Sequence, residues 1–252
     1  IGQERSRGLT TAERHHGQMH PEGFRKAQRI MGLVSKLHVP LFTFVDTPWP
    51  HYDPRSEEHG LGNAIATTMA LMSQLAVPTI SVVVGEGGSE GALALGVADR
   101  VLMLQNAIYA VSFPEEVAAM LGSDSPKAQE MADSLSLTAQ DCYELGLVDL
   151  VVPEPSEGAH RNPEEAASRL RRALEAELVV LNGRSTRRIL RDRYKKFRKM
   201  GESSSHFRAA LSREVSHLHG DVAHGGRRTR RRRSEESMPD SGEASSSDGG
   251  EV

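Results

Sequence analysis

A glycine-rich segment directly after an apolar run constrains this chain more than any other feature. Residues 85–96 read GEGGSEGALALG, and residues 79–84, TISVVV, precede them. Such a run is typical of a buried parallel strand, and the small apolar residues after the turn indicate a closely packed helix. A helix that begins at such a turn presents unpaired backbone N–H groups, which favour a phosphate, a carboxylate or a developing oxyanion. Because glycine has no Cβ, a ligand can approach that backbone closely.

Four interpretations of this turn are open. The dinucleotide fingerprint G-x-G-x-x-G fits poorly, because the final glycine falls one residue late, at Gly91. A nucleophile elbow, G-x-S-x-G, matches residues 87–91, and Asp149 and His160 follow Ser89 in the order of a hydrolase triad. A third interpretation uses only the backbone N–H groups, which would stabilise an enolate-like or ureido oxyanion in acyl-CoA or carboxyl-transfer chemistry. In the fourth, glycine only lets strand and helix pack closely.

Composition excludes several classes of protein. Of 252 residues, 38% are apolar, and the net charge of -3 does not indicate a nucleic-acid-binding protein. We attribute the low apolar fraction to a polar tail. The single cysteine, Cys142, excludes an internal disulfide and a cysteine-based zinc site, which fits a reducing compartment. No apolar run reaches membrane-spanning length.

Helical and strand patterns alternate along the chain, which predicts the α/β class. Amphipathic patterns predict helices at residues 21–38, 61–75, 114–121, 125–135, 138–146, 163–181 and 186–200, and one from the glycine turn to about residue 97. Apolar runs predict strands at residues 40–46, 78–84, 100–104, 107–111 and 148–152, and residues 47–60 are expected to form a loop. The apolar periodicity fades from about Gly201. We therefore expect one domain at residues 1–200 and a polar, largely disordered tail at residues 201–252.

The remaining polar features are interpreted as solvated. His15, His16 and His20 suggest a metal, but no further ligand pattern accompanies them, so a solvated loop is expected. The basic run at residues 227–233 is followed by an acidic, serine-rich end, and we interpret both as a disordered tail. Residues 1–3 resemble the end of a strand, which suggests that a segment precedes them or is encoded separately.

Several motifs together resemble the α subunit of bacterial and plastid acetyl-CoA carboxylase carboxyltransferase. Residues 21–29 match the family's P-E-G-[FY]-R-K-A-x-R, and residues 44–48 match its strand end, F-V-D-T-P. Residues 85–96 match G-E-G-G-S-G-G-A-L-A-x-G, and residues 153–164 match a late P-E-P and G-A-H-R-N-P-E signature. The resemblance runs to about Gly201, in the same order and spacing.

The resemblance implies a crotonase/Clp-like fold of repeated ββα units with C-terminal helices. It also implies a carboxyltransferase β subunit as partner, in an α2β2-like hetero-oligomer. Carboxybiotin, carried on a separate biotin carboxyl carrier protein, would donate its carboxyl group to acetyl-CoA to give malonyl-CoA, a step of fatty acid biosynthesis. The family's zinc lies in the β subunit, so no metal is expected in this chain. A cytoplasmic location, or the plastid stroma in a plant or alga, follows from the family, with no membrane or nucleic-acid partner.

Carried over by position, the backbone N–H donors to the ureido oxygen of biotin fall at Glu90 and Gly91. Gly87, Gly88 and Ala92 would shape the turn and bind the substrate.

Two departures from the family pattern fall near this site. Glu90 stands where the family has a small residue, usually glycine. Its carboxylate either points inward and repels the developing charge, or lies in the first helical turn, faces solvent and favours the helix dipole. The second departure is Trp49-Pro50, which replaces a flexible Gly-Ala pair in a loop that borders the family's site. Three functions therefore stay open: the carboxyltransferase α subunit, a non-catalytic structural paralogue, and a serine hydrolase or peptidase that uses Ser89.

Overall fold

In the part of the chain that the structure describes, five parallel strands form the sheet that carries the glycine turn. The computed structural model describes residues 1–5, 15–112 and 135–200. The strand order is β1-β2-β3-β5, and β4 pairs with the end of β2. The strands are β1 (Leu41–Thr47), β2 (Thr79–Gly88), β3 (Arg100–Leu104), β4 (Ile108–Ala110) and β5 (Leu150–Val152). Every pairing between these strands is parallel, so the predicted α/β class is confirmed.

The helices lie where the amphipathic patterns predict them, with ends that differ by at most two residues. They are α2 (Pro21–Leu37), α4 (Leu61–Gln74), α5 (Ser89–Gly96), α8 (Ala139–Glu144), α9 (Pro163–Asn182) and α10 (Thr186–Lys199). Two short elements were not predicted: η1 (His15–Gly17) and α3 (Pro54–Glu58), which lies inside the expected loop at residues 47–60. The helices predicted at residues 114–121 and 125–135 lie almost wholly outside the described residues.

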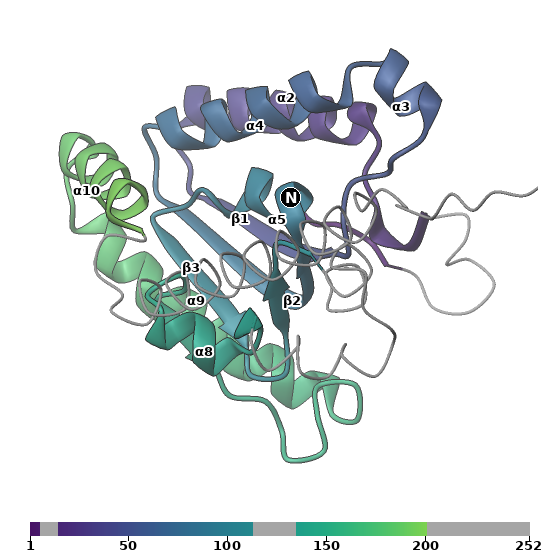
Figure 1. The fold of residues 1–252 in the computed structure, drawn as a ribbon. Coiled ribbons are helices and arrows are strands. Elements are labelled where there is room, and N and C mark those ends of the chain that lie inside the picture. The colour runs from purple at the N-terminus through teal and green to yellow at the C-terminus, as the bar shows by residue number, and fades with distance from the viewer. Residues whose placement is uncertain (6–14, 113–134, 201–252) are drawn as a thin grey trace, which may run out of the picture. The chain divides into compact units, whose positions relative to one another are not determined.

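Apolar residues from the strands and the surrounding helices form the main core. α5 packs on β1 and β2, and α4 packs on both α5 and α2, so α2 and α4 run side by side above the sheet in Figure 1. Ile80, Val82, Leu95 and Leu102 are almost fully buried in this core. The apolar stripe of α9 packs against it through Leu170, Leu174, Leu178 and Leu181, as the spacing predicts.

The first residues lie beside β1. Gly2 pairs with Phe44 in parallel, and the N–H groups of Gln3 and Phe44 donate to Phe44 and Ile1, respectively. The interpretation of residues 1–3 as strand-like is therefore confirmed. No helix of the described part of the chain is long and apolar enough to cross a membrane.

Candidate functional site

The glycine turn lies at the carboxyl end of β2, where the strand gives way to α5. The strand was predicted to end at residue 84, but it continues through Gly87 and Gly88, which pair with Tyr109 and Ala110 of β4. The prediction was wrong because β4 supplies a pairing partner that the sequence pattern does not reveal. The change of direction falls at Ser89, whose φ of 52° is in the left-handed region.

The glycines of this turn are required by close packing. An ideal Cβ on Gly87 would lie 2.3 Å from the Tyr109 ring, and one on Gly88 would lie 1.4 Å from the backbone oxygen of Pro48. A Cβ on Gly91 would meet Pro50 at 3.1 Å. The fourth interpretation, in which glycine lets elements pack, therefore holds at these positions, and it does not exclude a further use of the backbone N–H groups.

The loop that departs from the family pattern covers this turn. Pro48 and Pro50 are buried, and the Thr47 hydroxyl donates to the Trp49 carbonyl at 2.9 Å. The closest approaches of Gly88 and Gly91 are to these two prolines. The substitution of Trp49-Pro50 for a flexible pair thus places rigid backbone directly against the turn.

Asp46, at the end of β1, positions the turn from the other side. Its Oδ1 accepts a hydrogen bond from the Glu86 N–H at 3.0 Å, and its own N–H donates to Gln3 Oε1 at 2.9 Å. Arg5 reaches both carboxylates, at 3.7 Å from Asp46 Oδ1 and 2.5 Å from Glu86 Oε2. These contacts assign Asp46 a positioning role.

Glu90 lies in the first turn of α5, as the second alternative predicts, but its carboxylate does not simply face solvent. The Tyr52 hydroxyl and the Ser89 hydroxyl both donate to it, and the residue is half-buried. Burial raises the pKa of the Glu90 carboxyl, but hydrogen bonds from Ser89, Tyr52 and its own backbone N–H outweigh burial, so this pKa is lowered. The carboxylate is therefore ionised at neutral pH. It accepts a hydrogen bond from the Glu90 N–H, which is one of the two predicted backbone donors. Sequence reasoning missed Tyr52.

The start of α5 offers donors for an anion. The first N–H groups of a helix have no partner within it, and the N-cap, Gly88, contributes no side-chain hydrogen bond. The N–H groups of Glu90 and Gly91 belong to this first turn, and Gly91 and Ala92 are buried. The helix dipole adds partial positive charge at the same place.

The structure does not assemble the predicted hydrolase triad. Ser89 follows the carboxyl end of β2, whereas Asp149 precedes the amino end of β5 and donates its N–H to Val101 of β3. Because the strands are parallel, these positions lie at opposite ends of the strands, about 26 Å apart along the strand direction at 3.3 Å per residue. The Asp149 carboxylate instead accepts from Arg100, Lys196 and the Val101 N–H. His160 is exposed in a turn.

Comparison with solved structures first identifies the class of fold. A Pseudomonas malonate decarboxylase hetero-tetramer, solved in complex with coenzyme A, aligns with a TM-score of 0.61 at 18% identity, covering 82% of this chain and 79% of that one. Transcarboxylase 12S, solved with hydrolysed methylmalonyl-coenzyme A, aligns with a TM-score of 0.57 at 23% identity, covering 67% and 31%. The chain has the crotonase-like fold of these proteins, as the sequence predicts.

Sequence comparison then identifies the family. The family described as acetyl co-enzyme A carboxylase carboxyltransferase-like matches residues 1–201. The acetyl-coenzyme A carboxylase carboxyl transferase subunit alpha of Thermus thermophilus is 44% identical over 202 residues, covering 80% of this chain and 65% of that protein. The same subunit of Shouchella clausii is 46% identical over 198 residues, covering 77% and 61%. The chain belongs to this carboxyltransferase family and spans less than two thirds of the length of these two relatives.

Proposed function

We propose that this chain is the α subunit of an acetyl-CoA carboxylase carboxyltransferase, which transfers a carboxyl group from carboxybiotin to acetyl-CoA to give malonyl-CoA for fatty acid biosynthesis. The observation that carries the proposal is the family match over residues 1–201, which includes the glycine turn at the carboxyl end of β2. The proposed β subunit and biotin carboxyl carrier protein complete an α2β2-like hetero-oligomer in the cytoplasm or the plastid stroma. We propose residues 1–200 as the carboxyltransferase domain and residues 201–252 as a polar tail.

The chemistry assigned to the turn is stabilisation of an oxyanion. When bound, carboxybiotin supplies the carboxyl group, and negative charge develops on its ureido oxygen as that group leaves. The proposed donors to this oxygen are the backbone N–H groups of Glu90 and Gly91, with Gly87, Gly88 and Ala92 shaping the turn. Donors fixed by the fold need no reorganisation during the reaction, and the loss of one typically costs about 3 kcal/mol of barrier.

The backbone N–H groups of Glu90 and Gly91 fit an anionic oxygen, but the Glu90 carboxylate competes with that oxygen for the Glu90 N–H. The carboxylate already accepts a hydrogen bond from the Glu90 N–H and is ionised. An incoming ureido oxygen therefore has to displace the carboxylate, which the hydroxyls of Tyr52 and Ser89 hold in place. We infer that Glu90 slows the reaction relative to the glycine usual at this position, and that the carboxylate swings outward when the substrate binds.

The test compares the two roles that Ser89 could have. Ser89→Gly suits the left-handed backbone at this position and removes only the hydroxyl. In the complex with the β subunit, we expect carboxyl transfer from malonyl-CoA to biocytin to change by less than about 10-fold, because the donors are backbone groups. The unchanged chain should not label with a fluorophosphonate. A serine nucleophile would instead be identified if the wild-type chain labels with the fluorophosphonate and Ser89→Gly does not. Carboxyl transfer should then also fall by about 10⁶-fold in Ser89→Gly.

A further inference from the structure

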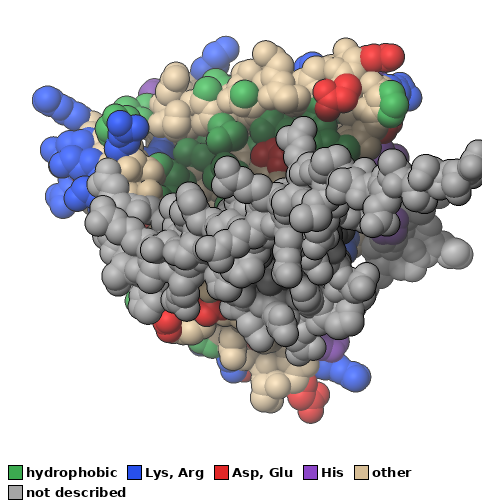
Figure 2. Space-filling model, viewed as in Figure 1, with side chains coloured by type: hydrophobic (Ala, Val, Ile, Leu, Met, Phe, Trp, Pro, Cys, Tyr) green, Lys and Arg blue, Asp and Glu red, His purple; other side chains and the backbone are tan. Residues whose placement is uncertain are grey.

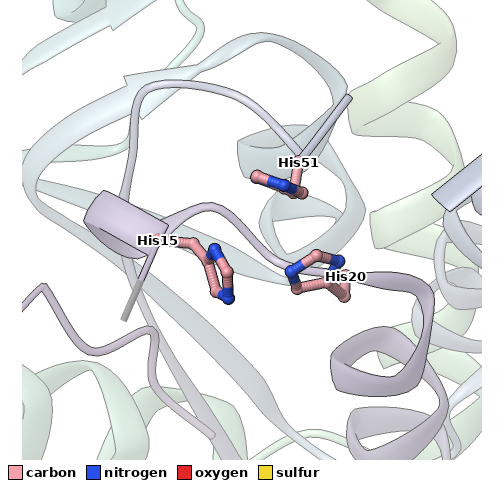
Figure 3. A group of neighbouring side chains, drawn as sticks. All are labelled: His15, His20 and His51. Carbon is pink, nitrogen blue, oxygen red and sulfur yellow. The ribbon is translucent and has the colours of Figure 1, made fainter. Parts of the chain in front are cut away.

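Three histidine side chains from separate segments converge beside the loop that covers the glycine turn. His15 lies in η1, His20 is the N-cap of α2, and His51 follows β1 in the covering loop (Figure 3). One nitrogen from each ring lies within 4.8 Å of the others. The ring centroids are 4.2 to 4.7 Å apart. His15 and His16 are exposed, as expected for a solvated loop, whereas His20 is half-buried and the rings of His15 and His20 both contact His51.

Two of the rings are held by hydrogen bonds at one nitrogen. His20 Nδ1 lies 3.1 Å from the hydroxyl of Ser56, which is 1% exposed. His51 Nδ1 lies 3.0 Å from Gln18 Oε1, an acceptor that fixes the proton on Nδ1. Such bonds orient a metal-binding imidazole, and a ring whose Nδ1 carries the proton keeps the lone pair on Nε2 for the ion.

The charges around the group suit a cation. Asp53 Oδ2 lies 3.8 Å from His51 Nε2.

We propose that His15, His20 and His51 bind one Zn²⁺ ion, with a fourth position open to water. Zinc takes imidazole nitrogens at about 2.0–2.1 Å in a tetrahedral arrangement, which places ligand atoms about 3.3 Å apart. The ligand atoms therefore have to move closer together by up to about 1.5 Å, and the exposed His15 ring is the least constrained of the three. The ion joins η1 and the start of α2 to the loop that carries Pro48, Pro50 and Tyr52.

A zinc ion at this site would hold the loop that covers the glycine turn in place. His51 lies next to Tyr52, which donates to Glu90, and next to Pro50, which lies against Gly91. The only tryptophan of the chain, Trp49, is two residues away from His51. Emission from Trp49 therefore reports on this loop alone.

The experiment uses the full chain, stripped with EDTA and titrated with Zn²⁺ alone. We expect a saturable change in Trp49 emission that is complete when one Zn²⁺ ion is bound per chain. Co²⁺ in place of Zn²⁺ should give the visible absorption spectrum of a tetrahedral site. His15→Asn and His51→Ala should weaken the binding seen by Trp49 at least 10-fold, and Gln18→Ala should weaken it 10- to 100-fold. The matched control is His16→Asn. His16 is adjacent to His15 and shares its left-handed backbone conformation, but it is not one of the three converging histidines.

The outcomes separate this site from other histidines of the chain. Zinc that binds without a change in Trp49 emission, or that binds equally well to His15→Asn and His51→Ala, lies elsewhere and overturns the proposal. An equal loss in His16→Asn also overturns it. Circular dichroism of each variant in EDTA identifies any variant that fails to fold. Gln18→Ala, which keeps all three ligands, then remains as the decisive variant.

Discussion

Gly88 tolerates the least change of the residues in the turn. Its φ of -95° is ordinary for any residue, so the requirement for glycine is purely one of space. A Cβ there would lie 1.4 Å from the Pro48 oxygen and 2.2 Å from the Pro48 carbonyl carbon, which are backbone atoms and cannot rotate away. The strand end and the covering loop therefore depend on each other.

Gly88→Ala should destabilise the fold by about 3 kcal/mol or more, because the covering loop has to move. The control is Gly32→Ala on the exposed face of α2, where an added Cβ meets nothing within 4 Å. That change should stabilise the fold by roughly 0.5–1 kcal/mol, because alanine loses less backbone entropy in a helix. Urea unfolding of both variants measures the difference, and equal stabilities would contradict the packing described here.

Glu90 should titrate below its ordinary carboxyl pKa of 4.5. The hydrogen bonds that lower this pKa stabilise the folded state fully above about pH 4.5. That stabilisation is lost as the pH falls through the lowered pKa of Glu90 in the folded state. Tyr52→Phe removes one donor, so the pKa of Glu90 should rise. NMR titration of the Glu90 side-chain carboxyl measures both values, and an unchanged pKa in Tyr52→Phe would show that the hydroxyl does not hold the carboxylate.

At the scale of elements, α10 is attached to the sheet through a buried arginine. Arg193 is 2% exposed, and its Nε and Nη2 donate to Asp99 at 2.8 and 2.7 Å. The same guanidinium donates to the carbonyls of Met72 at 2.7 Å and Leu75 at 2.9 Å. Figure 2 shows Lys and Arg side chains gathered on the surface where this basic helix lies.

Arg193→Ala should cost about 3–5 kcal/mol, because it leaves the Asp99 carboxylate buried without its partner. Arg193→Lys should recover only part of this, since an ammonium group cannot reproduce the paired hydrogen bonds of a guanidinium. Arg187→Ala, on the exposed first turn of α10, is the matched control and should change stability by less than about 0.5 kcal/mol. Thermal unfolding compares the three variants. A cost at Arg193 no larger than at Arg187 would show that α10 is not anchored in this way.

At the scale of the whole molecule, the sequence predicts the elements well, because local periodicity is what determines them. The stripe of α9 and strand β3 lie where the pattern predicts them. Contacts between distant segments were missed, because no local pattern encodes them. His51 is 31 residues from His20, and only the fold brings the rings together. The burial of Arg193 had one signal, its position four residues after Ile189 on the apolar face of α10.

The candidate site was predictable in position but not in surroundings. The glycine turn at residues 85–91 was located from sequence, because a strand followed by a glycine-rich helix start is a local pattern. The contact of Pro48 with Gly88 and the hydrogen bond from Tyr52 to Glu90 depend on how the loop after β1 folds back. The proposed roles of Glu90 and Gly91 rest on the family pattern.

The measurement that tests the central claim most directly is malonyl-CoA-dependent carboxylation of free biocytin, with the cognate β subunit present and absent. In this direction the carboxyl group passes from malonyl-CoA to biocytin and leaves acetyl-CoA. We expect transfer only when both chains are present, which would also show that Glu90 is compatible with catalysis. No transfer from a complex of verified assembly would contradict the account and favour a structural paralogue.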